Sequence, residues 1–232
     1  MEIQELIKEL IQKKITMVNF REFQTILDHY DNILKIPGDI VECGCWRGGF
    51  SIFLSTLFAN KKIWVCDSFA GFQPLDHATY EYAGERHIPS MTHNMIGPMS
   101  ISLEEVQNYF IEYNLLDKNK QNDRIQFIKG FVKDSLPTSG IENISLLRID
   151  VDAFSATLEV LELLYDKVSV GGFIVFDDSA LRESLDAIKA FIKQRNLETY
   201  LIHPSTHQKL DLFTKHSNDN SGFPAGCYLI KQ

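Results

Sequence analysis

The sequence predicts an α/β protein built on a doubly wound, seven-stranded Rossmann-like sheet. Seven short segments are mostly apolar runs, helical patterns lie between most of them, and carboxylates or glycines directly follow several of them. Apolar runs of this kind are typical of parallel strands that helices cover on both faces, and strands that alternate with helices form doubly wound sheets. Such sheets bind ligands at the carboxyl ends of their strands, so the residues after each run are candidates for a functional site.

Length and composition fit a single domain with a substantial core. The chain has 232 residues, 44% of them hydrophobic, and a formal net charge of −8. We therefore expect one domain, 1–232. The acidic balance argues against a nucleic-acid partner, no apolar run reaches the length of a membrane span, and the N-terminus has no signal-peptide pattern. These features predict a cytoplasmic protein that acts on a small molecule.

The first 36 residues are predicted to be helical. Apolar side chains recur at helical spacing at Ile3, Leu6, Ile7 and Leu10. Asn19 and Glu22 have the spacing of a capping-box variant, which predicts a second helix start. Pro37-Gly38 ends this arm.

Strands and helices alternate after residue 39. The strand candidates are 40–44, 62–67, 125–129, 145–150, 173–177, 198–203 and 227–231, and the helix candidates between them are 49–59, 155–168 and 180–196. Residues 70–103 interrupt this pattern, since they are rich in Gly, Pro, Met, His and Tyr and have no clear period. A long irregular segment inside a compact domain is usually functional, so we interpret 70–103 as a lid.

Carboxylates follow two neighbouring strands of the predicted sheet. Asp150 ends one strand, and Asp177 and Asp178 end the next. Because adjacent parallel strands end at the same edge, the three carboxylates should converge and repel one another unless a cation lies between them. Hard oxygen ligands suit Mg²⁺. The alternative for Asp177-Asp178 is a helix cap with a first-turn acid, and we interpret Asp152 as a helix cap rather than a ligand.

Three further acidic residues follow three successive strands and suggest a nucleoside cofactor. Glu42 precedes a glycine-rich loop with Gly44, Gly48 and Gly49, which departs from the G-x-G-x-x-G pattern of dinucleotide sites. Asp67 can accept hydrogen bonds from the ribose hydroxyls of an adenosine cofactor, and Asp134 can accept one from an adenine amino group. Turn or cap roles are the alternative for each residue singly. Their order favours S-adenosylmethionine over a dinucleotide.

These stretches together resemble the macrocin O-methyltransferase (TylF-like) family of S-adenosylmethionine-dependent sugar O-methyltransferases. The matching segments are PGDIVECGCWRGG (37–49), WVCDSFAGF (64–72), KDSLP (133–137), LRIDVDAFSAT (147–157) and LYDKVSVGGFIVFDD (164–178). The resemblance implies a seven-stranded class I methyltransferase fold, a homo-oligomer, and Mg²⁺ held by Asp150, Asp177 and Asp178. It also implies a hydroxylated acceptor, a sugar in most family members, and a histidine base in the lid, here nearest His93.

The residues expected at the site therefore form three groups. His93 is the candidate base, with His77 and His87 as alternatives, and the metal ligands are the three aspartates. The candidate cofactor-binding residues are Glu42, Gly44, Trp46, Arg47, Gly48, Gly49, Asp67, Ser68, Asp134 and Asp150.

Several positions depart from the family pattern, including Val151, Phe154, Ser179 and Phe131, and the lid matches worst. The acceptor could therefore be a phenolic or another small hydroxylated molecule, and a non-catalytic cofactor-binding protein or a Rossmann-like oxidoreductase remains an alternative. The lysine base of catechol-type O-methyltransferases is absent, because position 153 is alanine.

Overall fold

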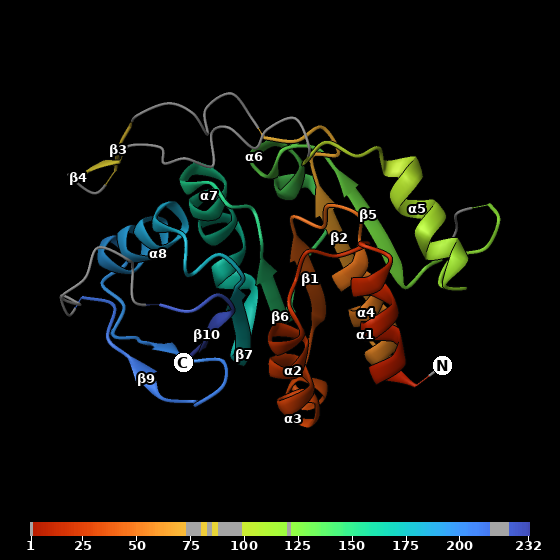
Figure 1. The fold of residues 1–232 in the computed structure, drawn as a ribbon. Helices are drawn as coiled ribbons and strands as arrows, with labels where there is room; N and C mark the ends of the chain where they lie inside the picture. The colour runs from red at the N-terminus through yellow and green to blue at the C-terminus, as the bar shows by residue number, and fades with distance from the viewer. Residues whose placement is uncertain (1, 73–79, 83–84, 88–98, 120–121, 214–222) are drawn as a thin grey trace.

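The computed structural model describes residues 2–72, 99–119, 122–213 and 223–232, together with the backbone of 80–82 and 85–87. In this part of the chain, a central sheet carries helices on both faces (Figure 1). The sheet has eight strands in the order β5-β2-β1-β6-β7-β10-β8-β9. The predicted α/β class is confirmed.

Five parallel strands form the main part of the sheet and set the position of the site. They are β5 (Ile125–Lys129), β2 (Ile63–Asp67), β1 (Asp39–Cys43), β6 (Ile144–Ile149) and β7 (Val168–Phe176). The remaining strands, β10 (Cys227–Ile230), β8 (Leu201–Ile202) and β9 (Lys209–Leu210), run antiparallel to their neighbours. Cys43 lies opposite both Cys66 and Ile149, and Ile149 lies opposite Phe176. The residues that follow these strands therefore emerge side by side at one edge.

Each face of the sheet has its own hydrophobic core, because side chains alternate along a strand. On one face, α7 (Phe154–Leu164) and α8 (Arg182–Gln194) pack against residues such as Val41 and Leu147. On the other face, α4 (Gly49–Leu57) and α5 (Leu103–Glu112) pack with the neighbouring residues Ile40 and Leu146. The short helix α6 (Val132–Ser135) follows β5, and 3-10 turns occupy Leu136–Thr138 and Tyr165–Lys167.

The N-terminal arm, residues 2–36, is helical as predicted. It comprises α1 (Ile3–Gln12), α2 (Phe20–Asp28) and α3 (Tyr30–Lys35), which lie on the α4 side of the sheet (Figure 1). The Asn19 side chain accepts the N–H of Arg21 at 3.0 Å and caps α2. Phe23 packs with its ring centroid 4.8 Å from that of Phe50 and 4.9 Å from that of Phe53. The arm thus shares one core with α4.

The strand boundaries near the C-terminal half differ from the prediction. The predicted strand 173–177 begins earlier, at Val168, and runs through Gly171, although the φ of Gly171 is +82°. The strand continues there because the Gly171 N–H donates to the carbonyl of Lys231 at 2.7 Å. The predicted strand 198–203 is shortened to β8, and β9 was not predicted. Both are two-residue strands, and β9 is the edge strand of the sheet.

Little of the predicted lid falls within the described residues. The backbone forms an antiparallel pair of β3 (Tyr80–Tyr82) and β4 (Glu85–His87). Helix α5 follows these strands and starts with a capping box formed by Ser102 and Glu105. His77 and His93 lie outside the described residues, as does the side chain of His87. Among the helices that the structure describes, none is long and apolar enough to cross a membrane.

A hydrogen-bonded aromatic cluster fixes the N-terminal arm to β10. The Tyr228 hydroxyl lies 2.8 Å from His29 Nε2 and 3.0 Å from His207 Nδ1. The His29 ring also lies 4.9 Å from that of Phe173. Burial and then the charge of His207 lower the pKa of His29, while Asp28 acts in the opposite direction.

We expect the cluster to make stability pH-dependent. A histidine whose pKa is lowered in the folded state binds a proton more readily when unfolded. Its stabilising contribution is therefore present above the ordinary pKa of about 6.5 and is lost as the pH falls through the folded pKa. The thermal midpoint of His29→Phe should fall less than that of the wild type between about pH 7 and about pH 5. Equal slopes in thermal unfolding scans of the two proteins would contradict this assignment.

Candidate active site

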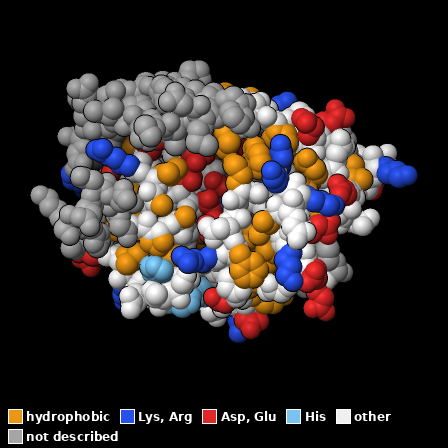
Figure 2. Space-filling view, in the orientation of Figure 1, with side chains coloured by type: hydrophobic (Ala, Val, Ile, Leu, Met, Phe, Trp, Pro, Cys, Tyr) orange, Lys and Arg blue, Asp and Glu red, His pale blue; other side chains and the backbone are white. Residues whose placement is uncertain are grey.

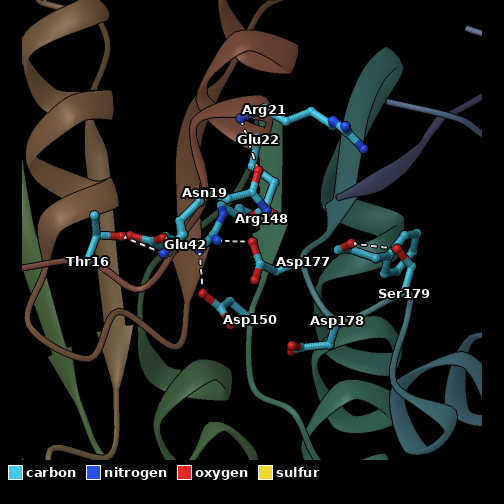
Figure 3. Close-up of polar contacts among 12 residues, drawn as sticks. Thr16, Asn19, Arg21, Glu22, Glu42, Arg148, Asp150, Asp177, Asp178 and Ser179 are labelled. Atoms are coloured by element: carbon cyan, nitrogen blue, oxygen red, sulfur yellow. Dashed lines mark hydrogen bonds and ion pairs between the residues drawn. The ribbon is translucent and has the colours of Figure 1, made fainter. Parts of the chain in front are cut away.

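One buried arginine holds together the carboxylates at the ends of three strands (Figure 3). Arg148 on β6 is 1% exposed. Its Nη1 donates to Glu42 Oε1 at 2.6 Å and to Asp150 Oδ2 at 2.8 Å, and its Nη2 donates to Asp177 Oδ1. The guanidinium also stacks over the ring of Phe50, with its central carbon 4.0 Å from the centroid. This single cation fixes side chains from β1, β6 and the end of β7.

The three predicted metal ligands come together beside this arginine. One carboxylate oxygen from each of Asp150, Asp177 and Asp178 lies within 4.8 Å of the others. Asp178 also accepts the backbone N–H of Asp152 at 2.9 Å. Burial, followed by repulsion from neighbouring carboxylates, raises the pKa of both Asp150 and Asp178. The cluster therefore has more negative charge than Arg148 neutralises, and a divalent cation would relieve the excess.

An acidic cavity of about 200 Å³ opens beside these carboxylates. Figure 2 shows acidic side chains near the middle of this face of the molecule. Thr16 and Glu22 of the N-terminal arm line the cavity together with Glu42, Asp177 and Asp178. Burial, followed by the charge of Asp177, raises the pKa of Glu22. The sequence assigned no role to Glu22 in the site, although its spacing from Asn19 was visible.

Glu42 lines the acidic cavity and is bound by other side chains of the protein. Its side chain is fully buried, and its Oε2 accepts the hydroxyl of Ser51 while its Oε1 accepts Arg148 Nη1. Burial raises the pKa of Glu42, and Arg148 opposes this rise. Glu42 thus serves as a counter-ion of Arg148. Its predicted contact with a ligand stays a prediction.

A second, more apolar pocket of about 110 Å³ adjoins the acidic cavity. Five of the predicted cofactor-binding residues line it, namely Gly44, Trp46, Asp67, Ser68 and Asp150. Other lining residues carried no assigned role, including Met17, Phe131 and Val132. These are scattered apolar side chains, so no local spacing distinguishes them from core residues in the sequence. Trp46, Asp150 and Met17 line both cavities, which are therefore adjacent.

Asp67 organises the loop that follows β1. Its Oδ2 accepts the backbone N–H groups of Cys45 at 2.8 Å and Trp46 at 3.0 Å, and its Oδ1 accepts that of Phe69 at 2.8 Å. One carboxylate thus ties the β1–α4 loop to the end of β2. Ser68 supports the same turn by donating to the carbonyl of Gly71 at 2.6 Å.

The glycines of the β1–α4 loop have different neighbours. A Cβ at Gly44, whose φ is +85°, would lie 1.7 Å from the carbonyl oxygen of Asp150, so only glycine lets the two segments approach. A Cβ at Gly49 would lie 2.6 Å from the carbonyl oxygen of Ile15 in the N-terminal arm. Arg47 also faces the arm, since it donates to the carbonyl of Lys14 at 2.9 Å. Gly48 packs near Val106 and Phe110 of α5. Arg47, Gly48 and Gly49 are not among the pocket-lining residues that the structure describes.

The structure contradicts the predicted role of Asp152 and places Asp134 at the surface. Asp152 does not cap a helix, because the N-cap of α7 is Ala153 and no side chain caps it. Asp152 instead lines both cavities, and its backbone turns with a φ of +56°. Burial raises the pKa of Asp152 to about 6. Asp134 is exposed on α6, and its neighbours Phe131 and Val132 line the pocket.

Removing Arg148 should strongly destabilise the protein. Arg148→Met leaves buried carboxylates without their counter-charge, so we expect the free energy of unfolding in metal-free buffer to fall by about 3–5 kcal/mol. Arg182 is the matched control, since it is 82% exposed and pairs with Asp186 at 3.6 Å. Arg182→Met should change the free energy by at most about 1 kcal/mol. Urea unfolding of both variants checks this, and losses of similar size would contradict the central role of Arg148.

Two curated relatives are similar to this chain over most of its length. The demethyldecarbamoylnovobiocin O-methyltransferase of Streptomyces niveus is 35% identical over 170 residues, which cover 70% of this chain and 62% of the relative. The 8-demethyl-8-(2,3-dimethoxy-alpha-L-rhamnosyl)-tetracenomycin-C 4'-O-methyltransferase of Streptomyces olivaceus is 33% identical over 180 residues, which cover 75% and 66%. The chain spans less than two thirds of the length of either relative.

A solved structure with a similar fold is also that of an O-methyltransferase. The solved structure of the O-methyltransferase NovP superimposes with a TM-score of 0.74 at 29% identity, and the match covers 93% of this chain and 81% of that one. The predicted methyltransferase fold is therefore confirmed. The family model described as macrocin-O-methyltransferase (TylF) matches residues 10–207. Since this match spans most of the sequence, the chain belongs to the macrocin-O-methyltransferase (TylF) family.

Proposed function

We propose that the protein transfers a methyl group from S-adenosylmethionine to a hydroxyl group of a sugar or glycosylated natural product, with the help of Mg²⁺. The observation that carries this proposal is the double position of Asp150, which lines the apolar pocket and also belongs to the three-carboxylate cluster. A methyl donor and a metal-bound acceptor would share this wall. Family membership supports the reaction class, and the relative from Streptomyces olivaceus, by its name, acts on a rhamnosyl tetracenomycin.

The apolar pocket is the proposed S-adenosylmethionine site. A carboxylate has about four acceptor positions, and three backbone N–H groups already use three of those of Asp67. Asp67 can thus accept about one ribose hydroxyl, with Ser68 beside it. Phe131 and Val132 supply apolar contacts for the adenine ring, and Asp134 accepts from its amino group at the exposed edge. The surplus carboxylates of the cluster favour the sulfonium cation.

Asp150, Asp177 and Asp178 are the proposed Mg²⁺ ligands. Their close carboxylate oxygens, which Arg148 only partly neutralises, match the hard, anionic donors that Mg²⁺ prefers. When bound, Mg²⁺ polarises the acceptor hydroxyl and lowers its pKa. The acidic cavity is the proposed acceptor site. Arg148 keeps Asp150 and Asp177 oriented toward this cavity, while the Asp152 N–H orients Asp178. The shared wall between the cavities aligns the acceptor oxygen with the methyl carbon and sulfur, and such alignment is a large share of catalysis.

We assign removal of the acceptor proton to His93 in the lid segment 70–103. An alcohol needs a base to take its proton as it attacks, and a histidine can do so near neutral pH.

We also propose that 1–232 acts as one domain, because arm residues such as Leu6 and Phe23 belong to the same core as α4. By family resemblance, we propose a homo-oligomer.

Methyl transfer should require the divalent cation. Incubation with S-adenosylmethionine, Mg²⁺ and a panel of sugar glycosides and phenols should give the mass gain of one methyl group on a sugar hydroxyl, detected by mass spectrometry. EDTA should abolish the gain, and added Mg²⁺ should restore it. Asp177→Asn should weaken Mg²⁺ binding about tenfold or more, because it removes an anionic ligand. A gain that survives EDTA would refute the metal role, and methylation of phenols alone would refute the sugar acceptor.

Loss of the proposed base should abolish turnover without loss of the cofactor. We expect His93→Ala to lower kcat by about 100-fold or more, as is typical when a general base is removed. Its affinity for S-adenosylmethionine in calorimetry should equal that of the wild type. His77→Ala and His87→Ala are matched controls from the same segment and should retain activity. Near-wild-type turnover of His93→Ala would reject the assignment, and inactivity of a control instead would move the role to that histidine.

A further inference from the structure

A buried carboxyl group of the N-terminal arm faces the acidic cluster. Glu22 on α2 is 5% exposed and lines the acidic cavity with Arg148 and Asp177. Figure 3 shows Glu22 beside these two residues. Its Oε1 accepts the side-chain amide of Asn19, whereas its Oε2 has no hydrogen-bond partner among the described residues. Because a buried oxygen without a partner is costly, its retention calls for a physical reason.

Glu22 is held in place from two sides. Asn19 binds it from the start of α2. On the other side, a Cβ at Gly226 would lie 2.9 Å from Glu22 Cγ, so the turn before β10 packs directly on this side chain. The Gly226 N–H lies 3.0 Å from the carbonyl oxygens of both Phe176 and Asp177. Glu22 therefore packs against the same turn that fixes the end of β7, directly before Asp177.

The charges around Glu22 are unbalanced without an added cation. Asp177 and Asp150 repel a negative charge on Glu22, and Arg148 attracts it. Arg148 is already shared among Glu42, Asp150 and Asp177. One guanidinium cannot neutralise this many carboxylates, so repulsion opposes the docking of α2 on the cluster until more positive charge is present.

The segment that precedes Glu22 covers both cavities. Met17 lines the apolar pocket as well as the acidic cavity, and Thr16 lines the acidic cavity. The carbonyl of Ile15 accepts the N–H of Gly49 at 3.2 Å, which seats this segment on the β1–α4 loop. The position of α2 therefore sets where Thr16 and Met17 stand over the site.

We propose that Glu22 is a positioning residue that couples docking of the N-terminal arm to binding of a divalent cation at Asp150, Asp177 and Asp178. The inference rests on the proposed metal site. A cation among these carboxylates attracts Glu22 across Asp177 and offsets the repulsion, so the arm docks more tightly. By thermodynamic reciprocity, the docked arm raises the affinity for the cation by the same factor. The docked arm supplies part of the wall of the acidic cavity.

Two measurements on the full chain test this coupling. Calorimetry gives the Mg²⁺ affinity, and hydrogen exchange of residues 15–28 is followed with and without Mg²⁺. In the wild type, Mg²⁺ should slow exchange across 15–28. Glu22→Gln keeps the shape but replaces the carboxyl group with an amide that cannot become negative beside the cation. It should bind Mg²⁺ about fivefold or more weakly, and exchange across 15–28 should no longer respond to Mg²⁺. Glu22→Asp, which keeps the charge, should restore part of both responses.

A charge change elsewhere on the arm is the control. Glu5 is 62% exposed, and Glu5→Gln should leave the Mg²⁺ affinity and the exchange response unchanged. If Glu22→Gln lowers thermal stability but leaves both Mg²⁺ responses as in the wild type, Glu22 is only structural and the coupling is overturned. If the wild type binds S-adenosylmethionine but no Mg²⁺, the metal site itself fails and the coupling fails with it.

Discussion

The buried guanidinium of Arg148 is the interaction on which the site depends. It lies on a central strand and contacts Glu42, Asp150 and Asp177, which come from three adjacent strand ends. Carboxylates this close and this buried would repel one another without it, and the strand ends could not remain in register. Arg148 nevertheless leaves a surplus of negative charge. That surplus makes the cluster suited to a divalent cation, so the stability and the proposed chemistry of the protein have one electrostatic origin.

The two cavities adjoin because backbone segments approach one another without intervening side chains. Gly44 lets the β1–α4 loop touch the carbonyl of Asp150, and Asp67 holds that loop through three backbone hydrogen bonds. The N-terminal arm then closes the site, with Met17 over both cavities. In the proposed reaction a methyl donor and its acceptor need close alignment, which the loop, the strand end and the arm would supply jointly.

Local patterns were enough to predict the sheet and the cluster of aspartates. The apolar runs that end in Gly44, Asp67, Asp150 and Asp177 identify parallel strands, and the shared edge of such strands brings those residues together. Predictions failed where position in the fold outweighs local pattern. Asp152 resembles a helix cap, yet its backbone turns away and Ala153 is the N-cap of α7. The strand around Gly171 continues because Lys231, distant in sequence, supplies its partner.

The sequence by itself determined the fold class, the family resemblance and the identity of the clustered aspartates, because hydrophobic period and strand-end residues act over short spans of chain. Only the tertiary structure decided the partners of each charge. Glu42 is a predicted ligand contact whose role as a counter-ion of Arg148 is visible only in the structure, while Glu22 looks like half of a helix cap in the sequence and becomes part of the acidic cavity. Charges act through space, so their roles follow from the three-dimensional neighbours that folding provides.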